Sequence, residues 1–221
     1  MKKLMVSLVW LCSVLPWMVM AVEPSAVGDK YQAGKEYQVL AIPVRTANPE
    51  KIEVNEVFWY GCSHCFEFET LIGPWSKALA ADVDFERTPA IWQEKMEAHA
   101  RAYYAAKQLK VLDKMHAVIF KTMHVDKHPL ENEDQLASLF AANGVDDAAF
   151  RKAFNSFSVQ SQSRQGDSRV RSYGVTGTPE VIVNGKYRVS SRDAGGQQQM
   201  LDVASFLIEK ERSTKSKADK K

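Results

Sequence analysis

The sequence predicts an α/β fold in which a mixed sheet is interrupted by an all-helical insertion. Segments with the apolar or alternating pattern of strands occur in the first part of the chain and again near its end. The roughly 75 residues between them carry apolar residues at helical spacing. Two cysteines, Cys62 and Cys65, stand at the expected start of a helix, directly after the most apolar strand. These observations favour a sheet that carries a cysteine pair and accommodates a helical insertion.

Five segments have the pattern of strands. Segment 52–60 is nearly continuous in apolar and aromatic residues at its end, as expected of a buried central strand. Asn184-Gly185 is a strong signal for a two-residue hairpin turn. The predicted strands are 37–40, 52–60, 83–87, 180–183 and 186–189.

Helical period, caps and helix breakers define the predicted helices. The helix that begins at Cys62 is expected to end at Gly73-Pro74, because proline cannot continue the hydrogen-bond ladder of a helix. Asn132 is a candidate cap with Gln135 at the capping-box position. The other predicted helices are 96–110, 113–123, 132–142, 146–154, 159–173 and 197–209.

The order of these elements defines the expected domains. Without the helical block, the remaining strands and helices have the layout of a thioredoxin fold. We therefore predict a thioredoxin fold with an all-helical domain inserted between the third and fourth strands. Its two parts are expected at 22–94 and 173–209, with the helical insertion at 95–172 and a charged flexible tail at 210–221.

Residues 1–21 have the pattern of a signal peptide, which predicts export. Lys2 and Lys3 precede an apolar stretch that ends in Val19-Met20-Ala21. Small or compact residues at the −3 and −1 positions of this end predict cleavage near Ala21. A membrane anchor is the alternative. However, Pro16 falls late in the stretch, and the apolar core is shorter than the ~20 residues that a span needs. A lipoprotein is disfavoured because bulky residues precede Cys12.

The mature chain is electrically neutral and holds few cysteines. Removal of residues 1–21 takes away Lys2 and Lys3, which leaves 200 residues with 27 basic and 27 acidic side chains. This balance gives no support to a nucleic-acid partner held by bulk charge. Cys62 and Cys65 are then the only cysteines, whereas an exported protein that needed structural disulfides would distribute them more widely. The pair therefore indicates catalysis.

The spacing of the cysteines assigns a different role to each. Cys62 should sit at the helix N-terminus, where unpaired N–H groups lower the pKa of its thiol. Cys65 lies about one turn further and is less exposed, so Cys62 is the attacked sulfur and Cys65 the resolving one. The alternatives are an inert disulfide or half of a zinc site. Zinc needs three or four protein ligands, and the remaining histidines are scattered, so we expect no metal and no cofactor.

Three further residues are predicted to support this pair. The imidazole of His64 can stabilise the Cys62 thiolate. If the pKa of the Cys62 thiol were about 4 in place of about 8.5, the reduced form would be favoured at pH 7 by about 4 kcal/mol. This corresponds to a reduction potential that is more oxidising by about 90 mV. Glu56 lies in the apolar strand before the cysteines, where it is either a strand-edge carboxylate that faces water or a buried charge, which is costly unless paired. Arg87 on the next strand is the expected partner, and the buried pair could relay a proton to or from Cys65.

Several motifs resemble the DsbA family of periplasmic disulfide oxidases, over nearly all of the mature chain. They are Glu56-Val57-Phe58-Trp59-Tyr60-Gly61-Cys62-Ser63-His64-Cys65-Phe66-Glu67-Phe68-Glu69, Gly174-Val175-Thr176-Gly177-Thr178-Pro179, Val183-Asn184-Gly185-Lys186-Tyr187 and Tyr31-Gln32-Ala33-Gly34-Lys35-Glu36-Tyr37.

The resemblance implies a Cys62–Cys65 disulfide that is donated to reduced exported proteins and restored by a quinone-linked membrane partner of the DsbB type. From the residues alone Pro179 could be an ordinary strand-entry proline. The resemblance instead implies a cis Thr178-Pro179 bond beside the cysteines, with the Thr178 backbone available to a client strand. Two residues depart from the best-known members, which have proline in place of Ser63 and valine in place of Thr178. Ser63 in place of proline is expected to weaken the oxidising power. Thr178 in place of valine adds a hydroxyl near the disulfide and is also seen in isomerase relatives.

Two other functions stay open at this point. One is a periplasmic isomerase or reductase, although those relatives usually carry a separate N-terminal dimerisation domain, and only about thirty residues precede the first predicted strand. The chain is expected to be a monomer. The other is a non-catalytic peptide-binding module whose disulfide braces a groove. An acidic Cys62 thiol would separate the oxidase from the bracing role.

Overall fold

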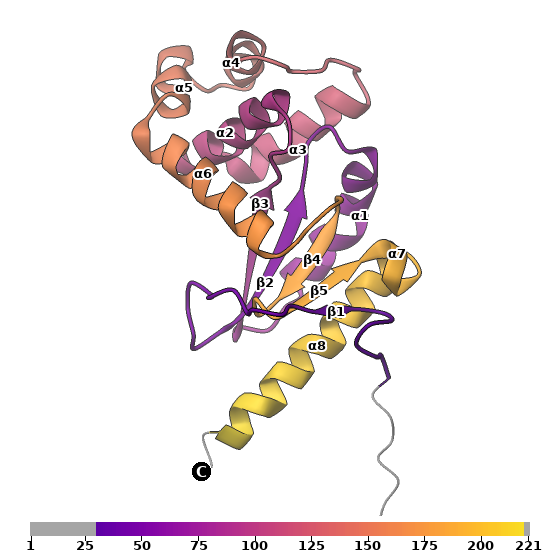
Figure 1. Cartoon of the computed structure of the whole chain (residues 1–221). Coiled ribbons are helices and arrows are strands. Elements are labelled where there is room, and N and C mark those ends of the chain that lie inside the picture. The colour runs from indigo at the N-terminus through magenta and orange to yellow at the C-terminus, as the bar shows by residue number, and fades with distance from the viewer. Residues whose placement is uncertain (1–29, 219–221) are drawn as a thin grey trace, which may run out of the picture. The chain divides into compact units, whose positions relative to one another are not determined.

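The structure, a computed structural model, describes residues 30–218, of which residues 31–218 belong to one compact unit. Its strands form one sheet in the order β1-β5-β4-β2-β3, in which β2 and β3 are parallel and the other neighbours antiparallel (Figure 1). The strands are β1 Gln38–Val39, β2 Ile52–Phe58, β3 Val83–Pro89, β4 Glu180–Val183 and β5 Tyr187–Ser190. The predicted mixed sheet is confirmed.

The helices fall into two groups along the chain. Helices α2 to α6 all lie between β3 and β4 in sequence, so the predicted helical insertion between the third and fourth strands is confirmed (Figure 1). The helices are α1 Ser63–Lys77, α2 Glu94–Gln108, α3 Leu112–His124, α4 Glu133–Ala142, α5 Asp147–Phe154, α6 Phe157–Ser172, α7 Ser191–Ala194 and α8 Gln197–Ala218. None of the helices in residues 30–218 is long and apolar enough to cross a bilayer.

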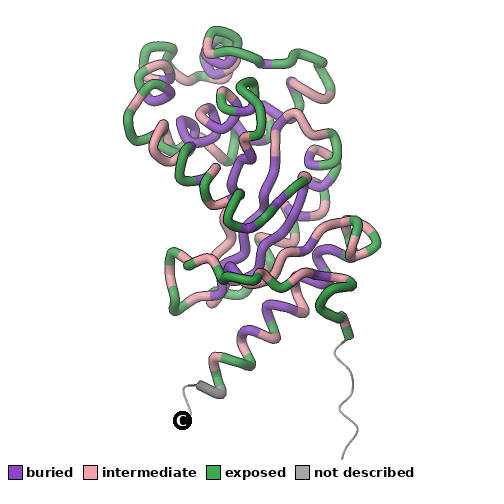
Figure 2. The backbone as a smooth tube through the Cα atoms, in the orientation of Figure 1, coloured by how far each residue is buried: buried purple, intermediate pink, exposed green. Residues whose placement is uncertain are grey.

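Strand β2 is buried along its whole length because helices cover both faces of the sheet (Figure 2). Val54 packs with Phe68 of α1 and with α8, whereas Val57 packs with Val170 of α6. Successive side chains of a strand point to opposite faces, so Glu56 lies on the same face as Val54, beneath α1. This alternation places a carboxylate under the helix that carries both cysteines.

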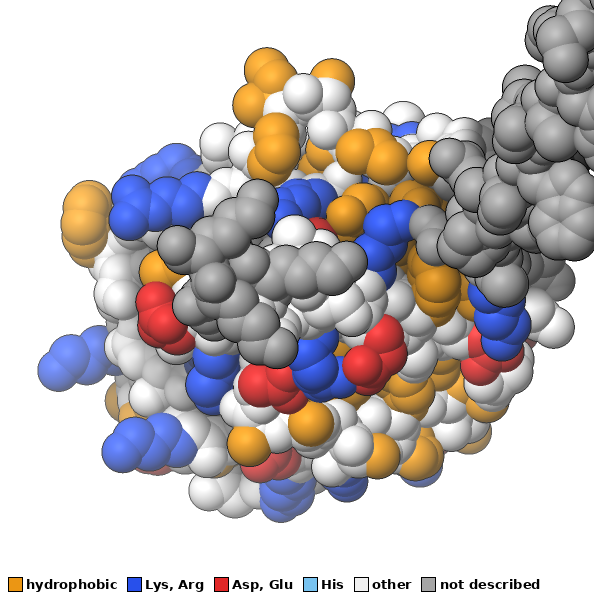
Figure 3. Space-filling model, turned by 90° about the horizontal axis from the view of Figure 1, so that it is seen from below, with side chains coloured by type: hydrophobic (Ala, Val, Ile, Leu, Met, Phe, Trp, Pro, Cys, Tyr) orange, Lys and Arg blue, Asp and Glu red, His pale blue; other side chains and the backbone are white. Residues whose placement is uncertain are grey.

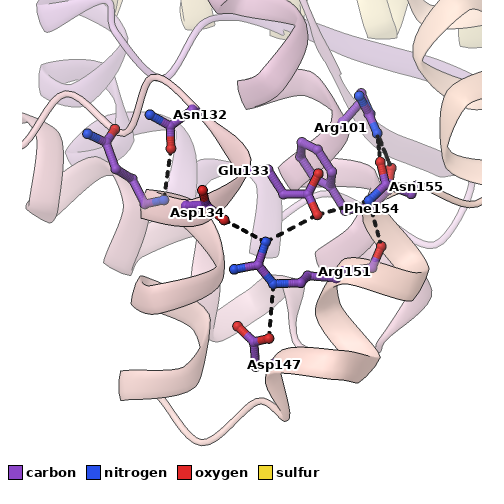
Figure 4. A network of polar contacts seen from close by, with 9 residues as sticks. Arg101, Asn132, Glu133, Asp134, Asp147, Arg151, Phe154 and Asn155 are labelled. Carbon is purple, nitrogen blue, oxygen red and sulfur yellow. Dashed lines mark hydrogen bonds and ion pairs between the residues drawn. The ribbon is translucent and has the colours of Figure 1, made fainter.

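The helical insertion packs around a buried cluster that includes Phe140 and Phe150, and caps and ion pairs add polar contacts at its surface. Asn132 Oδ1 accepts a hydrogen bond from the N–H of Gln135 at 3.0 Å, which confirms the predicted cap. Gln135 Oε1 accepts the backbone N–H of Glu131, at 2.7 Å, rather than the N–H of Asn132 that a capping box would use. Arg151 of α5 reaches Asp134 of α4 at 2.7 Å, and this pair joins the two helices (Figure 4).

The prediction that α1 ends at Gly73-Pro74 is wrong, because the helix continues to Lys77. Pro74 is exposed, whereas its neighbours Ile72 and Trp75 pack into the core, and Trp75 Nε1 donates to Ser205 of α8 at 3.0 Å. Burial of these side chains outweighs the hydrogen bond that the proline cannot make.

The prediction of a flexible tail at 210–221 is also wrong for the part that the structure describes. Helix α8 runs to Ala218, and Glu211 is 2% exposed. The Glu211 carboxylate accepts hydrogen bonds from Lys186 Nζ at 2.6 Å and from the Tyr187 hydroxyl at 3.0 Å. These contacts tie α8 to the β4–β5 hairpin and explain why the lysine-rich segment stays helical. Figure 3 shows basic and acidic side chains interspersed on the face seen from below.

The β4–β5 hairpin differs slightly from its prediction. Asn184 and Gly185 both have positive φ, 52° and 60°, as the turn signal requires. However, Val183 pairs with Tyr187, so β5 begins one residue later than expected and Lys186 belongs to the connection. The Lys186 carbonyl oxygen accepts the N–H of Leu40 instead.

Candidate active site

A tight turn after β2 delivers Cys62 to the start of α1. The N–H of Cys62 donates to the Trp59 carbonyl oxygen at 3.0 Å, and Cys62 itself is the N-cap of the helix. A Cβ atom on Gly61 would lie 2.3 Å from the indole ring of Trp59, so only glycine fits at this point of the turn. The turn therefore fixes the sulfur at the helix N-terminus, as predicted.

The environment of Cys62 favours its thiolate. The half-buried sulfur accepts the backbone N–H of Cys65 at 3.3 Å, in the way that a serine oxygen caps a helix. The pKa of Cys62 is lowered to about 5, most of all by the hydrogen bond from the Cys65 side chain and in spite of partial burial. The Thr178 side chain and the N–H groups of the first helical turn lower the pKa further.

Cys65 has the opposite environment. Its side chain is buried, with 0% exposure, and burial raises the pKa of its thiol far above the usual range. The neighbouring Cys62 raises the pKa further. Both cysteines are free thiols here, so the structure represents the reduced state. A half-buried thiol with a low pKa beside a buried thiol with a high pKa suits stepwise disulfide exchange, because the thiol with the lower pKa is the better leaving group.

The loop before β4 forms the other side of the sulfur. The Cys62 sulfur lies 3.3 Å from the carbonyl oxygen of Thr178, to which the thiol donates when it is protonated. The Thr178-Pro179 peptide bond is cis, as predicted. Pro179 is buried, and Thr178 is half-buried. Because β4 pairs directly with β2, the sheet itself brings these two distant parts of the chain together.

The two residues between the cysteines are exposed. Ser63 is the first residue of α1, and the side chain of His64 is 73% exposed. His64 Nδ1 lies 3.3 Å from Glu67 Oε2, so the imidazole is paired with a carboxylate. The backbone N–H of His64 is among the groups that lower the pKa of Cys62. An effect of the imidazole on the thiolate stays a prediction.

The predicted Glu56–Arg87 pair is confirmed. The two residues are opposite one another in the parallel β2–β3 register, and Arg87 Nε donates to Glu56 Oε2 at 2.7 Å. Glu56 is 0% exposed, and its other oxygen, Oε1, is buried without a hydrogen-bond partner. Burial raises the pKa of Glu56 to about 7, although Arg87 opposes this change. The proton-relay role of the pair stays a prediction.

Three residues of this buried cluster were missed by the sequence analysis. Arg87 also donates to Glu69, which accepts a further bond from His116 Nε2 at 3.1 Å. His116 Nδ1 lies 2.9 Å from the hydroxyl of Tyr60. Glu69 could have been found, because it lies four residues after Cys65 and therefore on the same face of α1. The pattern of α3 gave no such signal for His116.

Comparisons with known proteins agree with this geometry. A sequence model of the family described as DSBA-like thioredoxin domain matches residues 72–207. Thiol:disulfide interchange protein DsbA of Pseudomonas aeruginosa is 40% identical over 193 residues, which cover 87% of this chain and 92% of that protein. DsbA of Burkholderia cepacia is 36% identical over 180 residues, covering 80% and 84%.

Solved structures show the same relationship. The crystal structure of Pseudomonas aeruginosa DsbA covers 86% of this chain and 98% of its own, with a TM-score of 0.82 at 40% identity. NmDsbA1 of Neisseria meningitidis has a TM-score of 0.75 at 26% identity and covers 84% of this chain and 96% of its own. The chain belongs to the DSBA-like thioredoxin domain family, and it is a thiol:disulfide oxidoreductase.

Proposed function

We propose that this protein donates a Cys62–Cys65 disulfide to reduced proteins in the periplasm. The observation that supports this proposal best is the half-buried Cys62 sulfur, which is held at a helix N-terminus and has a pKa lowered to about 5. At pH 7 this thiolate favours the reduced form by about 2 kcal/mol, after allowance for its partial exposure to solvent. For a two-electron couple, that corresponds to about 40 mV in the oxidising direction.

The reaction proceeds by two thiol–disulfide exchanges. A client thiolate attacks Cys62 Sγ, the Cys62–Cys65 bond breaks, and Cys65 leaves with the electron pair and takes up a proton. The second client thiolate then attacks the client sulfur of the mixed disulfide. A client disulfide forms, and Cys62 leaves as a thiolate. The client is oxidised by two electrons and the cysteine pair is reduced. A leaving group with a low pKa departs faster, so the acidity of Cys62 drives the release of the client.

Two groups assist these steps. The Thr178 carbonyl, beside Cys62 Sγ, pairs with the backbone of an extended client strand. Glu56, whose pKa is raised to about 7 by burial, supplies the proton that Cys65 takes up. A leaving thiolate with so high a pKa needs a proton close by, and the raised pKa of Glu56 supports this role.

The remaining proposals concern location and partners. The signal sequence predicts export with cleavage near Ala21, and residues 1–21 lie outside the described residues. We propose that the monomer is reoxidised by a quinone-linked membrane protein of the DsbB type. The expected division at 22–94, 95–172 and 173–209 makes the first and last segments one domain, with the client site at the CxxC end of its sheet.

The test is to trap the mixed disulfide. Cys65→Ala removes the resolving sulfur, so complexes between Cys62 and clients should accumulate in the periplasm and appear as bands that reducing agent removes. The matched control, Cys62→Ala with Cys65→Ala, should capture nothing. If Cys65→Ala captures no exported protein while its remaining thiol still reacts with small disulfides, the proposal of a client oxidase is wrong. A redox equilibrium with glutathione as reducing as that of thioredoxin, about −270 mV, would indicate a reductase instead.

A further inference from the structure

The two carboxylates that share Arg87 have unequal surroundings. Glu69 Oε1 accepts His116 Nε2 at 3.1 Å and Arg87 Nη2 at 3.2 Å, and its Oε2 lies 3.3 Å from the same Nη2. Glu56 accepts one bond, from Arg87 Nε at 2.7 Å, and its Oε1 accepts none. Glu69 is also partly exposed, at 24% of its side chain, whereas Glu56 is 0% exposed. The hydrogen bonds and the exposure therefore stabilise the ionised form of Glu69 more than that of Glu56.

His116 is held in one orientation and one tautomer. An ionised carboxylate only accepts hydrogen bonds, so His116 Nε2 must donate to Glu69. Burial lowers the pKa of His116, so the ring is neutral at pH 7 and Nδ1 is free to accept. The hydroxyl of Tyr60 is 2.9 Å from Nδ1 and donates to it. The ring also packs against Phe58, with ring centroids 5.2 Å apart.

We propose that His116 is a positioning residue that keeps Glu69 ionised against Arg87 and thereby makes Glu56 the carboxyl group that holds the proton beneath Cys65. This inference rests on the proposed function, because the proton is the one that Cys65 takes up when its disulfide opens. The pKa of Glu69 is lowered in spite of burial, because His116 and Arg87 both stabilise its charge. Repulsion by the Glu69 charge is one of the causes that raise the pKa of Glu56.

All elements around this cluster contribute charged or titratable groups. Strand β2 supplies Glu56, strand β3 supplies Arg87, and helix α1 supplies Glu69 beside both cysteines. Tyr60, which follows β2, and Tyr103 of α2 have pKa values raised by burial, so both stay neutral. The balance of charge around Glu56 is therefore set by one arginine, one carboxylate and the thiolate of Cys62.

Two variants of His116 separate positioning from packing. In His116→Gln the new amide side chain can donate to Glu69 and accept from Tyr60 with similar spacing, and it does not titrate. In His116→Phe both hydrogen bonds are lost, but an aromatic ring still fills the space between Phe58 and Phe120. Thermal melts should show that both variants fold. Carbon-13 NMR of the glutamate carboxyl groups, assigned with Glu56→Gln and Glu69→Gln, then reports each titration directly.

In the wild type and in His116→Gln, the Glu56 midpoint should lie near 7 and that of Glu69 well below it. In His116→Phe, the Glu69 midpoint should rise by about one to two pH units, the size of one lost charge-assisted hydrogen bond, and that of Glu56 should fall. The pH dependence of the glutathione equilibrium should shift in the same variant. Unshifted midpoints in His116→Phe, with client oxidation intact, overturn this inference alone. Shifted midpoints in a protein that oxidises no client overturn the proposed function alone.

Discussion

The acidity of Cys62 makes the stability of the reduced protein depend on pH in a way that the disulfide form does not share. The pKa of Cys62 is about 5 in the fold, against about 8.5 for a cysteine in an unfolded chain. A lowered pKa stabilises the fold fully above about pH 8.5, and this stabilisation is lost as the pH falls through about 5. The reduced form should therefore gain stability over the oxidised form as the pH rises between these values.

The size of the effect follows from linkage. The unfolded state binds one more proton than the folded state in this window, which gives a slope of at most about 1.36 kcal/mol per pH unit. Cys62 is half-buried, so solvent screening reduces the expected gain between pH 5.5 and 7.5 to about 2 kcal/mol. For a chain of this length that is a change of about 4 to 8 °C in the difference between the two Tm values. Cys65 stays protonated in the folded and the unfolded reduced protein over this range, and so does not contribute to the pH dependence of stability.

The assay is thermal unfolding of the reduced and oxidised proteins at several pH values. Entropy from the crosslink offsets the two curves by a constant amount, so the test concerns how their separation changes with pH. Cys62→Ser, which has no acidic thiol, is the matched control and should lose the extra dependence. Parallel curves for reduced and oxidised wild-type protein would refute the reasoning, because they would mean that Cys62 has an ordinary pKa in the fold.

Two further predictions concern the buried charges. Arg87→Leu removes the partner of Glu56, so unfolding in urea should show a loss of about 3 to 5 kcal/mol at pH 8 but a smaller loss at pH 5, where Glu56 is protonated; an equal loss at both values would contradict the assigned pair. Glu211→Ala should cost about 1 to 3 kcal/mol and speed hydrogen exchange in the last turns of α8, since Lys186 and Tyr187 lose their shared acceptor. Unchanged exchange there would contradict the anchoring of α8 by this carboxylate.

Much of the fold could be predicted from local patterns. The apolar run that ends in Phe58 and the Asn184-Gly185 turn identified the central strand and the hairpin. The errors came from tertiary contacts that local patterns do not encode. Trp75 packs against α8 and carries α1 past Pro74, and Glu211 binds the hairpin and keeps the lysine-rich end helical.

The residues of the site likewise fall into those that local patterns predict and those that depend on tertiary contacts. Cys62, Cys65 and the cis Thr178-Pro179 bond follow from motifs whose geometry is local or typical of the family. The Glu56–Arg87 pair could be predicted because a charge in an apolar strand demands a partner. His116 could not, since its role depends on how α3 packs against α1, and helical periodicity does not specify that contact.

The central claim is that Cys62 is the stabilised thiolate and Cys65 the protonated partner. It is tested most directly by the ultraviolet absorbance of thiolate in the reduced protein, titrated alongside Cys62→Ser. The account predicts one thiolate with a midpoint of about 5, which is lost in Cys62→Ser, and no second thiolate until well above the usual pKa of cysteine. A first midpoint of about 8 or above, or an acidic thiolate that persists in Cys62→Ser, would contradict it.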